Sequence, residues 1–434
     1  MLAHRTRGRA DPDLTIRVRA RRLCRKGSIP LLVLAALAVA PALTGCGGVA
    51  TAPAASGVGK QLTIYSSLPL QGPSGPISQQ IVAGEKLALA DAKGRVGSLT
   101  VSYVSLDDSS PTTGEWDPGI TAANAKAAAQ DPTTIAYLGD YNSGATAVSL
   151  PLVNAAGILQ VSPASPYAGL TSSFDAGQDE PERFYPTAKR TFGRVAPGDS
   201  VQGRAQIALM RKLNVRRLYV LADQDPFDAP LAQIVASDAH AAGMEVVGND
   251  TVDVLAAPAN FEGEVSKIVE SGAHAVFFSG VPTIGAARLF RQLHAADPRL
   301  SLIGSSSTVN SLFTSRLGSA QSVTFLGTPA LAAGQYPRAS RTVIEEYRRH
   351  FGGSGGPYVL YGYETMSVVL AAIRSAGAHG DERQAVIDRF FATRDRSSVL
   401  GSYSIQPSGE TTLSRYGIDR VIRGVPVFWR AFNG

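Results

Sequence analysis

The 434-residue sequence predicts an α/β protein built from two lobes, each a doubly wound parallel sheet. Short apolar runs rich in Val, Ile and Tyr alternate with Ala-rich stretches of helical periodicity. This alternation breaks off between residues 167 and 198 and then resumes. Strands that alternate with helices form parallel sheets with helices on both faces, so two such series predict two lobes.

The elements follow from these patterns in order. In the first series we expect strands at 62–68, 99–107, 134–139 and 159–161, and helices at 80–92, 119–130 and 145–156. In the second we expect strands at 217–222, 245–250, 275–279 and 301–304, and helices at 201–212, 229–242, 262–271 and 284–296. Three helices (338–351, 358–376 and 381–392) and three strands (402–405, 418–422 and 425–432) end the chain. The stretch 167–198, rich in Gly, Pro and charge, predicts a long loop and a crossing between the lobes.

The N-terminus has the features of an export signal. A basic segment precedes an uncharged apolar run of 15 residues, 29–43, which is shorter than the roughly 20 residues that span a membrane. Leu-Thr-Gly-Cys at 43–46 resembles the bacterial lipobox, which implies a signal peptide at 1–45, lipid on Cys46 and a flexible tether at 46–60. A permanent membrane span and an ordinary signal cleaved near Ala42 are the alternatives.

The basic net charge belongs largely to that signal. Residues 1–45 hold nine of the 41 Lys and Arg residues and two of the 35 Asp and Glu residues, so the remainder is near neutral. Nucleic acid is therefore not an implied partner. Cys24 leaves with the signal, so we expect no disulfide in the mature chain.

No catalytic or metal-binding constellation stands out. No two histidines of the mature chain are spaced i,i+4, and the sequence has no zinc-binding cysteine set and no Walker loop. The segment 352–356 fits G-x-S-x-G, but a helix precedes it and Pro357 follows, which favours a helix connection over a hydrolase elbow. We expect no enzyme, no metal and no cofactor.

The loops beyond the carboxyl ends of the strands are where ligands bind in such sheets. Ser143 and Gly144 stand where the N-cap of a helix belongs, and the free N–H groups of that turn form a seat for an anion. The alternative is that Ser143 only caps its own helix. Segments 162–167, 223–227 and 305–308 hold the matching positions after other strands.

Several short motifs then resemble one family in order and spacing. They are Leu-Gln-Gly-Pro at 70–73 with Gly84 and Glu85, Leu-Asp-Asp at 106–108, the segments 139–143, 156–164 and 190–194, and 400–405 with Gly409. The chain resembles the leucine/isoleucine/valine-binding family of type 1 periplasmic binding proteins over most of residues 61–434. The resemblance implies three hinge crossings, near 194–197, 327–329 and 401–402, and a partner importer driven by ATP. One lobe is then 61–195 plus 328–400, and the other 196–327 plus 401–434.

The family's ligand positions carry over in part. The serine that holds a ligand carboxylate falls on Ser143, a backbone contact falls on Ala164, and two tyrosines are replaced by Ile77 and Phe227. The position of the acidic residue that pairs with a ligand ammonium falls near Ser306, which has no charge. The ligand-binding residues that we expect are Gln71, Asn142, Ser143, Gly144, Ala164, Ser165, Phe227 and Ser306.

The function that these features imply is extracytoplasmic solute binding. A lipid-anchored protein on the outer face of the cytoplasmic membrane would hold a small polar ligand of amino acid, amide or carboxylate type for the permease of an ABC importer. Because Ser306 has no charge to pair with a ligand ammonium, a carboxylate or amide with an apolar portion is expected to bind better than leucine or valine, unless Asp140, Asp223 or Asp225 replaces the missing acid. A ligand sensor for a membrane receptor and a secreted enzyme are the alternatives.

Overall fold

A computed structural model describes residues 60–173, 177–255 and 260–434. The expected signal peptide, the lipid-bearing Cys46 and all of the tether except Lys60 lie outside these residues. Within them, no helix is both long and apolar enough to cross a membrane.

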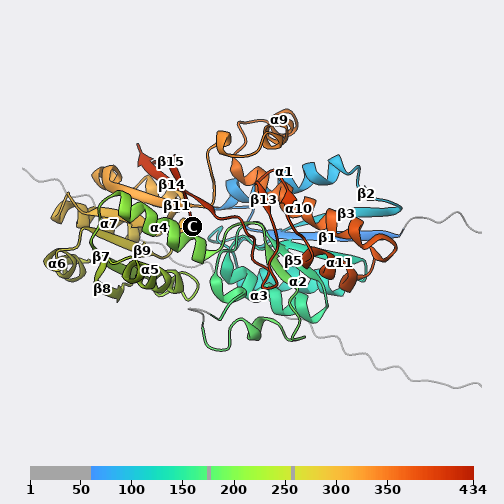
Figure 1. The fold of residues 1–434 in the computed structure, drawn as a ribbon, viewed down its shortest axis with the longest axis horizontal. Coiled ribbons are helices and arrows are strands. Elements are labelled where there is room, and N and C mark those ends of the chain that lie inside the picture. Colours follow the sequence, from blue (N-terminus) through green and yellow to red (C-terminus); the bar gives the residue numbers. More distant parts are fainter. Residues whose placement is uncertain (1–59, 174–176, 256–259) are drawn as a thin grey trace, which may run out of the picture. The chain divides into compact units, whose positions relative to one another are not determined.

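The first sheet has six strands in the order β2-β3-β1-β4-β5-β6. All neighbours run parallel except β2, which pairs antiparallel with β3. The strands are β1 (Gln61–Leu68), β2 (Arg95–Val96), β3 (Leu99–Asp107), β4 (Thr134–Gly139), β5 (Leu159–Ser162) and β6 (Phe192–Arg194). The helices between them are α1 (Gly75–Asp91), α2 (Pro118–Gln130) and α3 (Ser143–Ala155) (Figure 1).

The second sheet has seven strands in the order β15-β14-β11-β10-β9-β7-β8. Strands β7 (Arg217–Ala222), β8 (Glu245–Thr251), β9 (Ala275–Ser279), β10 (Ser301–Gly304) and β11 (Thr324–Thr328) are parallel. The hairpin of β14 (Arg415–Ile422) and β15 (Val425–Asn433) adds antiparallel to β11. The helices α4 (Asp199–Lys212), α5 (Ala229–Ala241), α6 (Glu262–Glu270), α7 (Ile284–Ala296) and the short α8 (Ser311–Thr314) belong to this part of the chain.

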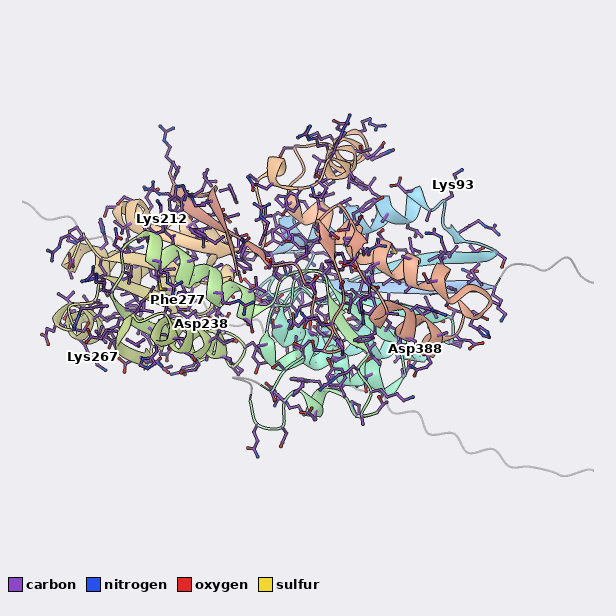
Figure 2. The ribbon with its side chains drawn as sticks, in the orientation of Figure 1. Lys93, Lys212, Asp238, Lys267, Phe277 and Asp388 are labelled. Carbon is purple, nitrogen blue, oxygen red and sulfur yellow. The ribbon has the colours of Figure 1, made fainter. Side chains whose placement is uncertain are left out.

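Alternating side chains of the second sheet bury two faces. Leu218, Val220 and Phe277 face a cluster with α4 and α5. Tyr219 and Phe278, their neighbours in sequence, face a cluster with α6 and α7. Successive strand residues point to opposite faces, so this division confirms the doubly wound arrangement. In Figure 2, Phe277 lies inside this lobe, whereas Lys212 and Lys267 are labelled at its surface.

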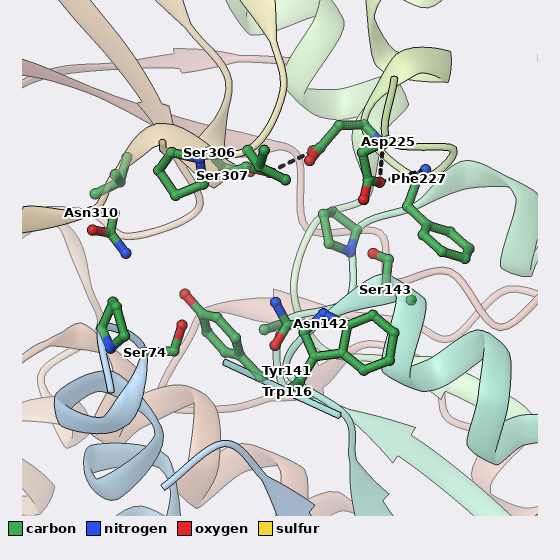
Figure 3. A pocket seen from close by; sticks show the side chains of 18 of the residues that line it. Ser74, Trp116, Tyr141, Asn142, Ser143, Asp225, Phe227, Ser306, Ser307 and Asn310 are labelled. Atoms are coloured by element: carbon green, nitrogen blue, oxygen red, sulfur yellow. Dashed lines mark hydrogen bonds between the residues drawn. The ribbon is translucent and has the colours of Figure 1, made fainter. Parts of the chain in front are cut away.

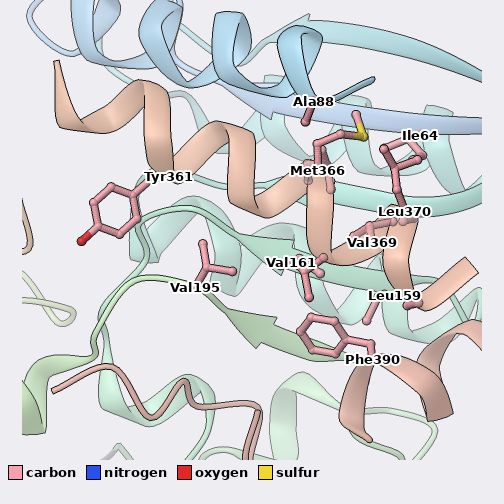
Figure 4. Close-up of a cluster of buried hydrophobic side chains, with 14 of the residues drawn as sticks. Ile64, Ala88, Leu159, Val161, Val195, Tyr361, Met366, Val369, Leu370 and Phe390 are labelled. Atoms are coloured by element: carbon pink, nitrogen blue, oxygen red, sulfur yellow. The ribbon is translucent and has the colours of Figure 1, made fainter. Parts of the chain in front are cut away.

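The chain returns to the first sheet after β11. It forms α9 (Ala339–Phe351), α10 (Pro357–Ala376) and α11 (Arg383–Phe391), and then the small two-stranded sheet of β12 (Arg396–Ser397) and β13 (Ser402–Tyr403). Figure 4 shows Met366, Val369 and Leu370 of α10 packed with Ile64, Val161 and Phe390 in one buried cluster. Helices α1, α10 and α11 therefore cover one face of this sheet, and α2 and α3 cover the other.

Helices α1 and α10 lie backbone to backbone. A methyl group on Gly84 would come within 2.0 Å of the carbonyl oxygen of Val359, and one on Gly362 within 2.0 Å of that of Ile81. Only glycine allows this approach. It sets the middle of α1 against the start of α10.

Four strands (β2, β6, β11 and β12) were not expected from the sequence, and several helix and strand boundaries differ from the prediction. β6 and β11 were not expected as strands, because each is short and lies where a crossing was predicted. Helix α1 begins at Gly75 instead of residue 80, since Pro76 is tolerated in a first helical turn. Tyr403 and Ile405 are buried with the first sheet's core, which favours a third crossing after Thr411 instead of at 401–402. The lobe boundaries themselves stay a prediction.

Candidate functional site

A cleft of about 500 Å³ lies where the carboxyl ends of both sheets meet. Its lining comes from the loops that follow the strands. After β1, β3, β4 and β5 these loops supply Ser74, Trp116, Asn142 and Ala164, and after β7, β9 and β10 they supply Phe227, Pro282 and Ser306. Figure 3 shows Ser74, Trp116, Tyr141, Asn142 and Ser143 on one side of the opening and Ser306, Ser307 and Asp225 across from them.

The loops that follow the strands of the first sheet form one side of the cleft, which we call the first wall. The start of α3 forms a polar seat in it. Asn142 is the N-cap residue but its side chain makes no capping bond, so Ser143 is the first helical residue and not the cap. Thr146 N is the first backbone donor to bond inside the helix, to Asn142 O, and the preceding N–H groups remain available. The positive end of the helix dipole thus lies at the cleft.

The backbone N–H of Tyr167 determines the direction in which the Ser143 hydroxyl can form a further hydrogen bond. Its Oγ accepts a hydrogen bond of 3.2 Å from the backbone N–H of Tyr167. A hydroxyl that already accepts from a backbone donor can give its own hydrogen to another group. Ser143 is therefore equipped to donate to an oxygen in the cleft.

The loop that contains Tyr167 is held by a buried arginine. Arg194 is fully buried at the end of β6 and donates through Nη1 to the carbonyl oxygens of Ser165 and Tyr167. Its Nε lies 3.1 Å from both carboxylate oxygens of Glu410, and Nη2 completes this ion pair. Arg194 thus joins the first crossing, the third crossing and the loop behind Ser143.

The opposite side of the cleft, formed by the loops that follow the strands of the second sheet and called the second wall, carries carboxyl groups. Asp223 accepts from the backbone N–H groups of Asp225 and Val281, which folds the loop after β7. Asp225 Oδ1 in turn accepts from Phe227 N at 2.8 Å and from Asp228 N at 3.2 Å, and Ser307 Oγ donates to Asp228 Oδ1 at 2.6 Å. This folding presents Asp225 and Asp228 to the cleft, together with Asp199 from the first turn of α4.

Two of the carboxyl groups in the cleft, Asp228 and Asp199, have raised pKa values. The pKa of Asp228 is raised to about 7, mainly by burial and also by the negative charges of Asp225 and Asp223, while the Ser307 hydrogen bond opposes the rise. Burial also raises the pKa of Asp199 well above its usual range, although the charge of Arg194 opposes the rise.

Aromatic rings close the sides of the cleft. Phe227 of the second wall meets Tyr167 edge to face, with ring centroids 5.5 Å apart. A methyl group on Gly144 would lie 2.5 Å from the Trp116 ring and 3.0 Å from Phe227, so only glycine fits at the second position of α3. Tyr416 donates to Gln202 Oε1 at 2.5 Å, and the same oxygen accepts from Ser306 N at 3.0 Å.

Six of the eight residues expected from the sequence line the cleft: Asn142, Ser143, Gly144, Ala164, Phe227 and Ser306. The other two do not. Ser165 is fully buried behind the lining, where its Oγ donates to Asp140 O at 2.9 Å. Gln71 is exposed and donates to Asp107 at 2.7 Å.

Other acidic residues lie near the ammonium position that was expected to be lost at Ser306. Ser306 carries no charge, but Asp199, Asp225 and Asp228 line the same side, and the exposed Glu115 stands at the rim. Of the three possible replacements, Asp225 is in the lining, whereas Asp140 and Asp223 are not. Asp228 and Asp199 were missed because they lie at the starts of helices, where an acidic residue usually stabilises the helix.

Two further carboxyls are buried below the first wall. Asp108 and Asp140 are fully buried, and burial raises the pKa of both. Asp140 accepts from Tyr137, Ser149 and Gln160, so it organises the loop before α3 from inside the fold. Within the described ranges, no group of three or more His, Cys, Asp and Glu side chains could hold a metal ion.

Comparison with solved structures shows the same fold in solute-binding proteins. A leucine-binding protein from Thermotoga maritima superposes with a TM-score of 0.70 at 18% identity, covering 86% of this chain and 99% of that one. An isoleucine complex of a branched-chain amino acid transporter substrate-binding protein from Streptococcus pneumoniae gives 0.67 at 17% identity, with 86% and 99% coverage. A benzoate complex of a solute-binding protein from Rhodopseudomonas palustris gives 0.66 at 15% identity, with 86% and 96% coverage.

A sequence comparison identifies the family. No curated protein matches the chain. The family described as periplasmic binding protein matches residues 62–415, which include both sheets up to the start of β14. The match covers most of the chain, and the neighbours share its two parallel sheets. The chain therefore belongs to the periplasmic binding protein family and has its type 1 fold.

Proposed function

We propose that this protein captures a small polar ligand in the cleft between its two lobes and delivers it to an ABC importer. One observation carries the proposal: the loops after the strands of both sheets converge on a single cleft that holds both a helix N-terminus and carboxylates. Membership of a family of solute-binding proteins supports it. The ligand is of amino acid, amide or carboxylate type, as the polar lining suggests.

The direct test is to identify the molecule that the cleft retains. The mature chain, purified without denaturation, is analysed by native mass spectrometry before and after unfolding. We expect a small molecule that is released on unfolding and that raises the melting temperature when it is added back. Cells without this protein should take up that molecule more slowly. Absence of any retained molecule, together with no stabilisation by a broad panel of metabolites, would contradict the proposal.

Lipid on Cys46 would anchor the protein to the outer face of the cytoplasmic membrane. The lipobox-like Leu-Thr-Gly-Cys at 43–46 supports this part of the proposal. Cys46→Ala should release the protein from the membrane fraction or block its processing, whereas Cys24→Ala, which changes the other cysteine, should do neither. If Cys46→Ala is cleaved normally and still fractionates with membranes, the anchor is something else.

A further inference from the structure

Carboxyl groups line one side of the cleft. Asp199, Asp225 and Asp228, which we call the acidic wall, all belong to the part of the lining contributed by the second lobe. Of the residues that the structure describes, no Lys, Arg or His lines the cleft. A binding site for a simple anion would normally place Arg or Lys beside it, because charge-assisted hydrogen bonds are the strong ones.

Each loop carboxylate has one oxygen engaged and one available. Asp225 uses Oδ1 for two backbone N–H groups, and Asp228 uses Oδ1 for the Ser307 hydroxyl. Among the described residues, the Oδ2 atoms of both have no hydrogen-bond donor, and none of the three acidic-wall residues forms an ion pair. The side chains are thus fixed in position while a pair of acceptor atoms remains available for a ligand.

Among the described residues, no cationic side chain forms an ion pair with this wall. The guanidinium of Arg194 acts on Asp199, but it is paired with Glu410 and holds two backbone carbonyls. Asp199 is only 3% exposed, and Asp228 is half-buried. Burial accordingly raises the pKa of Asp199 and Asp228, which favours their protonated forms, and a bound cation would favour the ionised forms again.

Aromatic rings line the same cleft and suit the same kind of ligand. Trp116, Tyr141, Phe227, Tyr358 and Tyr416 contribute to the lining. Aromatic faces attract organic cations, most strongly where water is excluded. A zwitterion with one ammonium and one carboxylate could place its carboxylate at α3, but it brings a single positive charge to three carboxyl groups. A ligand with a further positive charge would also stabilise the ionised forms of Asp228 and Asp199.

We propose, on the basis of the solute-binding function above, that the cleft selects small organic cations, ligands that carry more positive than negative charge. The acidic wall receives the amino or guanidino group. Any carboxylate of the ligand lies at the start of α3, at Ser143. Neutral amino acids and aromatic monocarboxylates such as benzoate are then poor ligands.

Matched ligand pairs test the role of charge separately from size. L-arginine and L-citrulline, and L-lysine and L-norleucine, are titrated calorimetrically into the ligand-free protein, with benzoate as the anion. The cationic member of at least one pair should bind about tenfold or more tightly than its neutral partner. Asp228→Asn and Asp225→Asn should each reduce that ratio, whereas Glu264→Gln, an equal charge change on the exposed face of α6, should not.

Melting curves of the variants confirm that each is folded. Mass spectrometry identifies any retained molecule by its mass, and its ionisable groups then give its charge in solution. Equal or tighter binding of the neutral partners or of benzoate overturns the charge selectivity while solute binding stands. If no probe binds, the retained molecule decides: a cation supports the inference, and a neutral or anionic molecule overturns it. Only the absence of both a retained molecule and any binding would also refute the proposed function.

Discussion

Ser143 combines a fixed acceptor role with a free hydrogen. Its Oγ accepts from Tyr167 N, and the N–H groups of the first α3 turn lie beside it. Ser143→Ala should weaken a ligand that carries a carboxylate by about one to two orders of magnitude, because a hydrogen bond to a charged group contributes about 1.5–3 kcal/mol. Calorimetric titration measures the loss, with the amino acid that binds most tightly among the matched ligand pairs.

The matched control is the decarboxylated form of that same ligand, such as cadaverine for lysine. It has no carboxylate for Ser143, so its affinity should differ little between wild type and Ser143→Ala. If both ligands lose affinity equally, Ser143 shapes the loop through Tyr167 instead of holding the carboxylate. Because Ser143 does not cap α3, its substitution should leave the helix intact.

Asp228 makes binding depend on pH. Its pKa is about 7, raised by burial first and then by Asp225 and Asp223, and Asp199 also faces it. A cation binds the ionised carboxylate, so affinity should rise with pH, by about tenfold between pH 6 and pH 8, as the proton leaves Asp228. Titration of L-lysine, whose amino groups stay largely charged over this range, measures the slope.

The same titration with Asp228→Asn provides the check. Without this carboxyl the pH dependence should flatten, and any dependence that remains reports other groups, Asp199 among them. A variant that retains the full slope would assign the titration to another group. Affinity that falls with rising pH would contradict the claim that the ionised carboxylate of Asp228 binds the cation.

At the scale of elements, the contact between α1 and α10 positions part of the first wall of the cleft. Ser74 and Ile77 lie at the start of α1, and Tyr358 lies at the start of α10. Gly362→Ala forces a methyl group against the Ile81 carbonyl, which should destabilise the fold by about 1–3 kcal/mol or more. Equilibrium unfolding in urea measures this change, and the displaced helices should also weaken ligand binding.

Gly263→Ala is the comparison for that variant. A methyl group on Gly263, in helix α6, would meet nothing within 4 Å, so alanine should leave stability unchanged or raise it by up to about 1 kcal/mol. If Gly362→Ala is equally harmless, the helices can separate at no cost and the close approach is not needed.

At the scale of elements, local pattern predicted most of the fold. Strands such as β4, β7 and β9 have the bounds expected from their apolar runs, because each is buried on both faces. β6 has only three residues, including Gly193, and β11 ends in Gly327 and Thr328. Neither segment therefore shows in its own sequence the apolar run that indicates a strand. Such short strands are determined by pairing with distant segments, which one sequence does not display.

The sequence predicted only those residues of the candidate site that lie in a single loop after a strand. Ser143, Gly144 and Ala164 follow strands directly, so their position in the lining could be inferred from one loop at a time. Asp199 and Asp228 come from two segments of chain that only the tertiary fold brings to the same cleft. Their joint charge, which decides the kind of ligand, could not be read from either segment alone.

Across the whole molecule, ligand binding should bring the lobes together. Hinge closure around a ligand is a common motion of two-lobed binding proteins, and here each wall contributes different chemistry to one ligand. Small-angle scattering of the mature chain should give a smaller radius of gyration with a saturating ligand than without. Asp228→Asn at the same ligand concentration should remain in the open form, and an unchanged radius for the saturated wild type would contradict closure.

Arg194 gives this closure a particular mechanical character. The residue ends β6 at the first crossing, pairs with Glu410 near the third, and holds the carbonyls of Ser165 and Tyr167, whose N–H supports Ser143. These contacts connect the crossings directly to the carboxylate seat. We therefore expect a bend at the crossings to move the seat with it, so that the hold on the ligand depends on how far the lobes are open.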